Sequence, residues 1–192
     1  GGVGANYTPE DWDRAIRHGV AKDGRRLIIM PSQNYASMSD ADFRAVAAYL
    51  ATLPAASSTL PARKVGVLGR VLIGTGAFPL AARTIAHDSV GLVSPVAASG
   101  PVYGKYLVTL ATCADCHGAD FRGRTGQPAG PDIRSIAAKW SVDDFRKTIR
   151  TGVDPTGRIL NPELMPWKFY AKMTDDELAD VWAYIGEVAR KP

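Results

Sequence analysis

The chain has 192 residues, of which 46% are hydrophobic and 22% charged, a composition typical of a folded protein and not of a disordered one. Its formal charge is +4, but the Lys and Arg residues are scattered, which argues against a nucleic-acid-binding surface. Two cysteines three positions apart exclude a disulfide framework. The longest apolar run, residues 65–82, is interrupted by Arg70 and Pro79, so the sequence predicts no transmembrane helix.

The first predicted elements belong to an internal repeat. Residues 12–27 align with residues 145–160, and residues 30–50 align with residues 165–185. By direct count 16 of the 37 aligned positions are identical, which is too many for chance. The two segments are therefore predicted to form the same structural unit.

Each copy of the repeat predicts a short helix, a loop that leads to a Met-Pro pair, and a terminal amphipathic helix. The short helices end near Gly19 and Gly152, since glycine favours a helix C-terminus. Capping boxes begin the terminal helices after Ser39 and Thr174, and the second is closer to the ideal pattern. The apolar positions recur at i, i+3, i+4 and i+7 and predict one buried face. They are Phe43, Val46, Ala47 and Leu50 in the first copy and Leu178, Val181, Trp182 and Ile185 in the second.

Between the copies lies a predicted connector, residues 56–100. Its ends, residues 53–64 and 94–101, are rich in Ala, Ser and Pro and are typical of linkers. The apolar remainder, residues 65–93, is expected to be buried or packed on a surface, with a short helix against one domain.

The sequence Cys-Ala-Asp-Cys-His at 113–117 is the motif that carries chemistry. Two thiols three positions apart on a helical turn can add to the two vinyl groups of one porphyrin, and the next residue, His117, can then donate to the iron. A thioredoxin-like redox pair would follow a strand, whereas a helix is predicted here. A zinc site would need two further ligands, and only His18 and His87 remain. The motif therefore predicts one haem c, bound through Cys113 and Cys116.

With this motif in place, residues 101–192 resemble a class I cytochrome c domain. The resemblance rests on Gly104 and Tyr106, the Cys-x-x-Cys-His motif, and the sequences GPDI at 130–133, LMPW at 164–167 and VWAYI at 181–185. The whole chain resembles a two-domain bacterial cytochrome c in which the attachment half of the first domain is absent. The implied fold is all-α: residues 1–55 are the trailing half of a first domain, and residues 101–192 are a complete second domain.

The resemblance also implies roles for single residues. Gly104 would let the first and last helices cross closely, with Tyr184 packed there, and the carbonyl of Pro131 would accept a hydrogen bond from His117 Nδ1–H. The distal ligand is Met165 or Met173. Met165 is favoured, because it lies in a Met-Pro loop, whereas Met173 directly precedes a helix cap. Trp167 is a candidate donor to a haem propionate, with core packing as an equal alternative.

In the first copy, Met30 takes the place of Met165. We expect an upstream segment with a second Cys-x-x-Cys-His motif, and Met30 as the distal ligand of a second haem. Two alternatives remain. Residues 1–55 could pack against the connector without a haem, or a neighbouring subunit could complete this half-domain.

His/Met ligation fills both axial positions of the iron, which favours electron transfer over chemistry at the metal. The resemblance implies a subunit or redox partner of a bacterial respiratory or dehydrogenase complex, in the periplasm or at the outer face of the inner membrane. The alternative is a di-haem redox enzyme, either peroxidase-like or thiosulfate-oxidising. An electron carrier is favoured over an enzyme.

Overall fold

The computed structural model describes residues 3–54, 64–91, 99–126 and 128–191. These residues form helices, with isolated antiparallel bridge pairs inside three loops, so the all-helical prediction is confirmed. The contacts divide the chain into two compact units, residues 1–95 and 96–192. The connector elements that precede residue 95 thus belong to the first unit.

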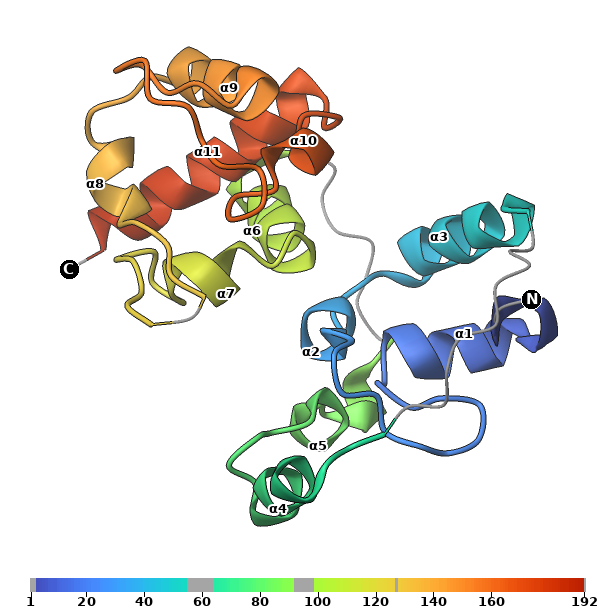
Figure 1. Ribbon diagram of the computed structural model, residues 1–192. Helices are drawn as coiled ribbons and strands as arrows, with labels where there is room; N and C mark the ends of the chain where they lie inside the picture. The colour runs from blue at the N-terminus through green and yellow to red at the C-terminus, as the bar shows by residue number, and fades with distance from the viewer. Residues whose placement is uncertain (1–2, 55–63, 92–98, 127, 192) are drawn as a thin grey trace. The chain divides into compact units, whose positions relative to one another are not determined.

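The second unit is built around its first and last helices (Figure 1). It comprises α6 (Gly100–Leu110), α7 (Cys113–His117), α8 (Ile133–Ala137), α9 (Val142–Thr151), α10 (Trp167–Tyr170) and α11 (Asp175–Arg190). The complete capping box predicted at Thr174 begins α11, with reciprocal bonds between Thr174 and Glu177. Helix α11 packs against α6, α8 and α9 and therefore organises the unit.

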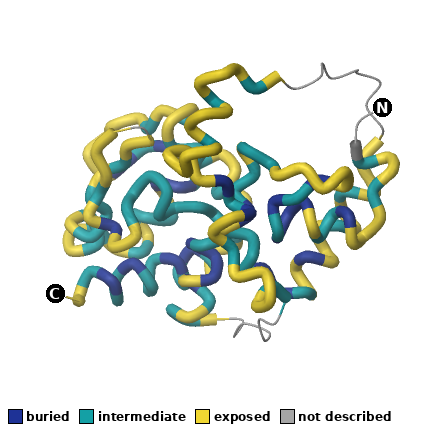
Figure 2. Tube along the Cα trace, turned by 90° about the horizontal axis from the view of Figure 1, so that it is seen from below, coloured by how far each residue is buried: buried dark blue, intermediate teal, exposed yellow. Residues whose placement is uncertain are grey.

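Helices α6 and α11 approach each other closely at Gly104. A Cβ atom at Gly104 would lie 1.9 Å from the carbonyl oxygen of Asp180 and 3.0 Å from Tyr184 Cβ, so only glycine fits. The crossing buries Tyr106, Leu107 and other apolar residues of α6 against α11. The resulting core contains Tyr106, Leu107, Val108, Phe121, Val181, Ile185 and Val188, and buried positions recur along α11 in Figure 2. The predicted helix crossing is confirmed.

The first unit repeats the trailing half of this arrangement. It comprises η1 (Val3–Asn6), α1 (Pro9–Ile16), α2 (Ser32–Tyr35), α3 (Asp40–Thr52), α4 (Val67–Thr75), α5 (Ala81–Thr84) and η2 (His87–Ser89). Helices α1, α2 and α3 match α9, α10 and α11 of the second unit in order and in sequence. The loops match too, because the bridge pair Val20–Arg26 recurs as Val153–Ile159.

The two terminal helices differ in what covers them. Val188 of α11 is 9% accessible, whereas its counterpart Leu53 on α3 is 48% accessible. Tyr49, the counterpart of the half-buried Tyr184, is 64% accessible. Only Phe43 is buried on α3. Within the described part of the first unit, α3 has no helix that corresponds to α6.

The connector differs from its prediction. Helix α5 contacts α2, as expected for a packed segment, but α4 is largely exposed and its apolar side chains face solvent. The reason is that α4 makes no extensive contact with another described helix. Among the described residues, no helix has the length and apolar character needed to cross a bilayer.

Two glycines of the second unit test the helix crossing. Gly104→Ala should lower the free energy of unfolding by about 3 kcal/mol, because the new methyl group meets the backbone of α11. Gly186→Ala is the matched control on α11, since its nearest neighbour there is an arginine side-chain atom 3.8 Å away. It should raise the stability by about 1 kcal/mol through helix propensity. Denaturant unfolding of the haem-loaded protein measures both, and equal effects would contradict a tight crossing.

Candidate functional site

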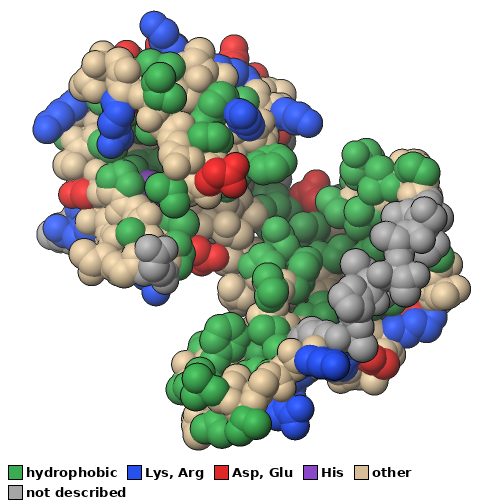
Figure 3. All heavy atoms as spheres, in the orientation of Figure 1, with side chains coloured by type: hydrophobic (Ala, Val, Ile, Leu, Met, Phe, Trp, Pro, Cys, Tyr) green, Lys and Arg blue, Asp and Glu red, His purple; other side chains and the backbone are tan. Residues whose placement is uncertain are grey.

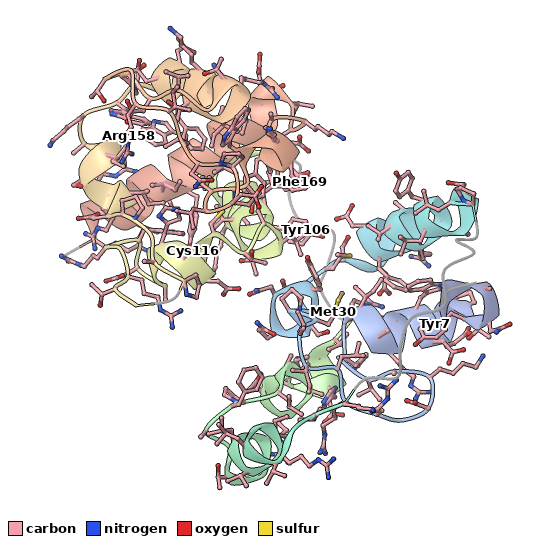
Figure 4. The ribbon with its side chains drawn as sticks, in the orientation of Figure 1. Tyr7, Met30, Tyr106, Cys116, Arg158 and Phe169 are labelled. Atoms are coloured by element: carbon pink, nitrogen blue, oxygen red, sulfur yellow. The ribbon has the colours of Figure 1, made fainter. Side chains whose placement is uncertain are left out.

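Helix α7 presents both cysteines and His117 on little more than one turn. Thr112, immediately before it, has a positive φ of 56°, as does Phe121 beyond it with 60°. Both are positions where a residue with a side chain is strained, and such strain concentrates at functional sites. Both cysteines are free, so both can react with one ligand that lies beside the helix. Figure 4 labels Cys116 on this helix.

The His117 ring is oriented by the loop at residues 130–133. Its Nδ1 lies 2.9 Å from the carbonyl oxygen of Pro131. Because a carbonyl only accepts, Nδ1 must carry the proton, and Nε2 keeps its lone pair for a metal. Gly130 makes the approach possible, since a Cβ there would lie 2.6 Å from the Cys116 carbonyl oxygen and 3.0 Å from His117 Nδ1.

Met165 lies in a short irregular loop before α10. The loop is folded by hydrogen bonds from the Met165 backbone N–H to the Asn161 carbonyl, 2.9 Å, and from the Trp167 backbone N–H to the Met165 carbonyl, 2.7 Å. Met165 is half-buried. Met173 instead packs against the hydrophobic core of the second unit. The packing role expected for Met173 therefore agrees with the structure, and Met165 remains the candidate ligand.

A long-range hydrogen bond joins the methionine loop to the attachment helix. The Tyr170 hydroxyl of α10 donates to the carbonyl of Ala111, 2.9 Å away, just before the cysteine motif. Trp167 donates its indole N–H to the Leu160 carbonyl at 3.3 Å, and its ring packs on Gly152. The indole donor is thus engaged within the loop, and its proposed contact with a propionate stays a prediction. Sequence reasoning missed the Tyr170 bond, although the tyrosine recurs as Tyr35 in the repeat.

Two arginines that recur in the repeat bind protein groups. Arg150 pairs with Asp175 at 2.8 Å and donates to the Ala171 carbonyl. Arg17 pairs with Asp40 at 2.7 Å, which lowers the pKa of that carboxyl group. Each arginine thereby ties the short helix of its unit to the start of the terminal helix. Arg158, which Figure 4 labels, pairs with Asp154 at 3.1 Å.

In the first unit the two methionines are also distinguished by burial. Met38, which matches Met173, is buried, whereas Met30 is half-buried directly before α2 (Figure 4). This difference parallels the one in the second unit, where Met173 packs against the core and Met165 is half-buried. The rings of His18 and His87 stack, with their Nδ1 atoms 2.8 Å apart. Burial lowers the pKa of His18.

The donor set fits a c-type haem. Two thiols on one turn would provide two attachment points. An imidazole whose Nδ1–H is held by a carbonyl and a thioether on a separate loop would be the candidate axial ligands. Burial raises the pKa of the Cys113 thiol to about 12, so this sulfur is a neutral thiol before attachment. Among the described residues, no group of three or more His, Cys, Asp or Glu side chains is placed to hold a metal ion.

Comparison with known families decides the identity of the second unit, since residues 102–189 match the family model of cytochrome c. Residues 102–189 are a cytochrome c domain. The covalently bound cofactor of this domain is haem c, attached through Cys113 and Cys116.

Curated relatives extend the similarity into the first unit. The gluconate 2-dehydrogenase cytochrome c subunit of Pantoea cypripedii is 31% identical over 180 aligned residues, which cover 79% of this chain and 40% of the relative. The fructose dehydrogenase cytochrome subunit of Gluconobacter japonicus is 28% identical and covers 84% of this chain and 36% of the relative. The alcohol dehydrogenase (quinone) cytochrome c subunit of Gluconobacter oxydans (strain 621H) is 26% identical over 95 residues, 42% of this chain and 20% of the relative. The chain thus spans well under half the length of these relatives.

Two methionine variants test the assignment of the distal ligand. Met165→Ala should lower the reduction potential by on the order of 100 mV, because a thioether ligand stabilises the reduced iron, and should change the haem spectrum. Met173→Ala should leave the spectrum unchanged and cost about 2 kcal/mol of stability as a core truncation. Redox titration and denaturant unfolding distinguish the two effects. The reverse pattern would show that Met173 is the ligand.

Proposed function

We propose that this chain carries electrons through the haem c of its second unit, with His117 and Met165 as the axial ligands. The observation that carries the proposal is the hydrogen bond from His117 Nδ1–H to the Pro131 carbonyl, which leaves Nε2 aimed for coordination. When bound, haem c supplies one-electron chemistry by alternating between ferrous and ferric iron. The protein residues hold both axial positions and leave no open site for a substrate.

Electron transfer is also supported by the contacts that hold the methionine loop close to the cysteine motif. The Tyr170–Ala111 hydrogen bond fastens the methionine loop to α6, and the Arg150–Asp175 ion pair fastens α9 to α11. A site held in this way changes little when the iron gains or loses an electron, and a small rearrangement favours fast transfer. Leu164 and Phe169 flank the methionine loop and are exposed, and these two apolar side chains suit transient contact with a redox protein.

We further propose that the chain works as a cytochrome subunit of a dehydrogenase complex at the periplasmic side of the inner membrane. Relatives described as cytochrome subunits of gluconate, fructose and alcohol dehydrogenases support the partner class. The aligned region of the gluconate dehydrogenase relative covers more of the chain than the second unit alone.

The visible spectrum distinguishes an electron carrier from the alternative, a di-haem redox enzyme. In the reduced protein at neutral pH, carbon monoxide should leave the spectrum of the haem on Cys113 and Cys116 unchanged, because Met165 occupies the distal position. In Met165→Ala carbon monoxide should bind readily, which provides the positive control. Ready binding to the unaltered protein would contradict the electron-carrier proposal and favour enzyme chemistry.

For the first unit we propose that residues 1–55 are the trailing half of another cytochrome c domain, with Met30 as the distal ligand of a second haem. The repeat, the half-buried Met30 and the uncovered face of α3 support it. The face of α3 matches the face of α11 that packs on α6, so an α6-like helix with its own attachment motif would complete the pocket.

Haem stoichiometry tests the second site. The native protein, purified from the periplasmic and membrane fractions of its own cells, should contain covalent haem in addition to that on Cys113 and Cys116. Met30→Ala should shift the potential of that additional haem, whereas Met38→Ala should not, because Met38 is a buried packing residue. One haem per protein and no effect of Met30→Ala on any potential would contradict the proposal. Recovery of the haem-loaded protein from the cytosol would contradict the proposed location.

A further inference from the structure

Helix α4 exposes apolar side chains over a wide arc of its surface. Val67 is 78% and Leu68 71% accessible, and Val71 and Leu72 are exposed as well. Figure 3 shows hydrophobic side chains gathered over this helix, with basic side chains beside them. The only charged residue of the helix is Arg70. Four adjacent large apolar residues on a helix exposed to water mark a surface that meets an apolar environment.

The sequence that surrounds α4 carries charge of one sign. The sequence contains no Asp or Glu between Asp42 and Asp88. The basic residues of this stretch are Arg44, Arg63, Lys64, Arg70 and Arg83. An exposed apolar helix within a basic, acid-free stretch is typical of helices that lie in the headgroup region of an anionic bilayer.

Beside α4 lies a hollow of about 470 Å³ that contains three arginines. Arg25 and Arg26 come from the loop of the first repeat and Arg70 comes from α4, while Ile28, Ile73 and Leu80 form the apolar part of the lining. Arg25 uses Nε to bind Asp23 at 3.1 Å, and Arg70 uses Nε to bind the Val65 carbonyl at 2.9 Å. Within the described residues, their terminal guanidinium nitrogens remain available to an anion. Arginines beside apolar side chains suit a phosphate group joined to a hydrocarbon chain.

We propose that α4 lies flat on an anionic phospholipid bilayer, with Val67, Leu68 and Val71 among the acyl chains. A lipid phosphate group then occupies the hollow between Arg25, Arg26 and Arg70. With nine residues α4 is too short to cross the bilayer, so the contact is confined to the interface. The basic residues and the lack of Asp and Glu in the sequence from residue 43 to residue 87 favour an anionic bilayer over a protein groove as the occupant. This inference does not depend on the ligands of the haem.

Sedimentation with vesicles tests the proposal on the haem-loaded full chain. The protein should bind vesicles of equal parts phosphatidylglycerol and phosphatidylcholine, and bind pure phosphatidylcholine at least about tenfold more weakly. High salt, about 1 M, should reduce the binding to the anionic vesicles, because it screens the arginines. Inorganic phosphate at millimolar concentration should not compete, since a free anion lacks the apolar contact.

Two triple variants separate the apolar and the charged contributions. Val67→Ser/Leu68→Ser/Val71→Ser should weaken vesicle binding at least about tenfold through lost apolar burial. Arg25→Gln/Arg26→Gln/Arg70→Gln should weaken binding to anionic vesicles on the order of 100-fold, at about fivefold for each arginine. Val102→Ser/Ile159→Ser, which alters two exposed apolar residues of the second unit, is the matched control and should bind as the parent does.

All variants change exposed residues, and the haem absorption and helical circular dichroism verify that each has folded. Binding without preference for anionic lipid, or triple variants that bind as the parent does, would overturn the assignment of α4. Failure of the parent to bind any vesicle would also overturn it and indicate that a protein covers this helix.

Discussion

The close crossing of α6 and α11 is the constraint on which the second unit depends. Only glycine at position 104 lets the backbone of α11 approach α6, and the core of the unit forms along that contact. The crossing also determines where the cysteine motif begins, because α7 follows α6 after two residues. The positions of Cys113, Cys116 and His117 are therefore a consequence of helix packing and not of the motif alone.

The first unit shows what the same sequence pattern does without that crossing. Helix α3 keeps the apolar periodicity of α11, yet Tyr49 and Leu53 are exposed where Tyr184 and Val188 are covered. The Arg17–Asp40 pair, like Arg150–Asp175, still fixes the short helix to the terminal helix. The trailing half thus retains its local geometry, while the face that would meet an α6-like helix remains open to solvent.

Much of the fold could be predicted from the sequence, because caps, glycines and apolar periodicity act locally. The capping box at Thr174 and the close approach at Gly104 are examples, and the repeat extended the same prediction to α3. Contacts that join distant segments could not be predicted in this way. The Tyr170–Ala111 hydrogen bond and the His18–His87 pair depend on how loops return in space, for which a single sequence has no periodic signal. The exposure of α4 was missed because an apolar run predicts burial whether or not a partner is present.

Hydrogen exchange of the 192-residue haem-loaded chain tests the central claim that the helix crossing is complete in one unit and open in the other. The account predicts strongly protected amides in α11, since its covered face holds the core together, and exchange in α3 that is faster by about two orders of magnitude or more. Equal protection of α3 and α11 would contradict it, because α3 would then be as firmly covered as its counterpart.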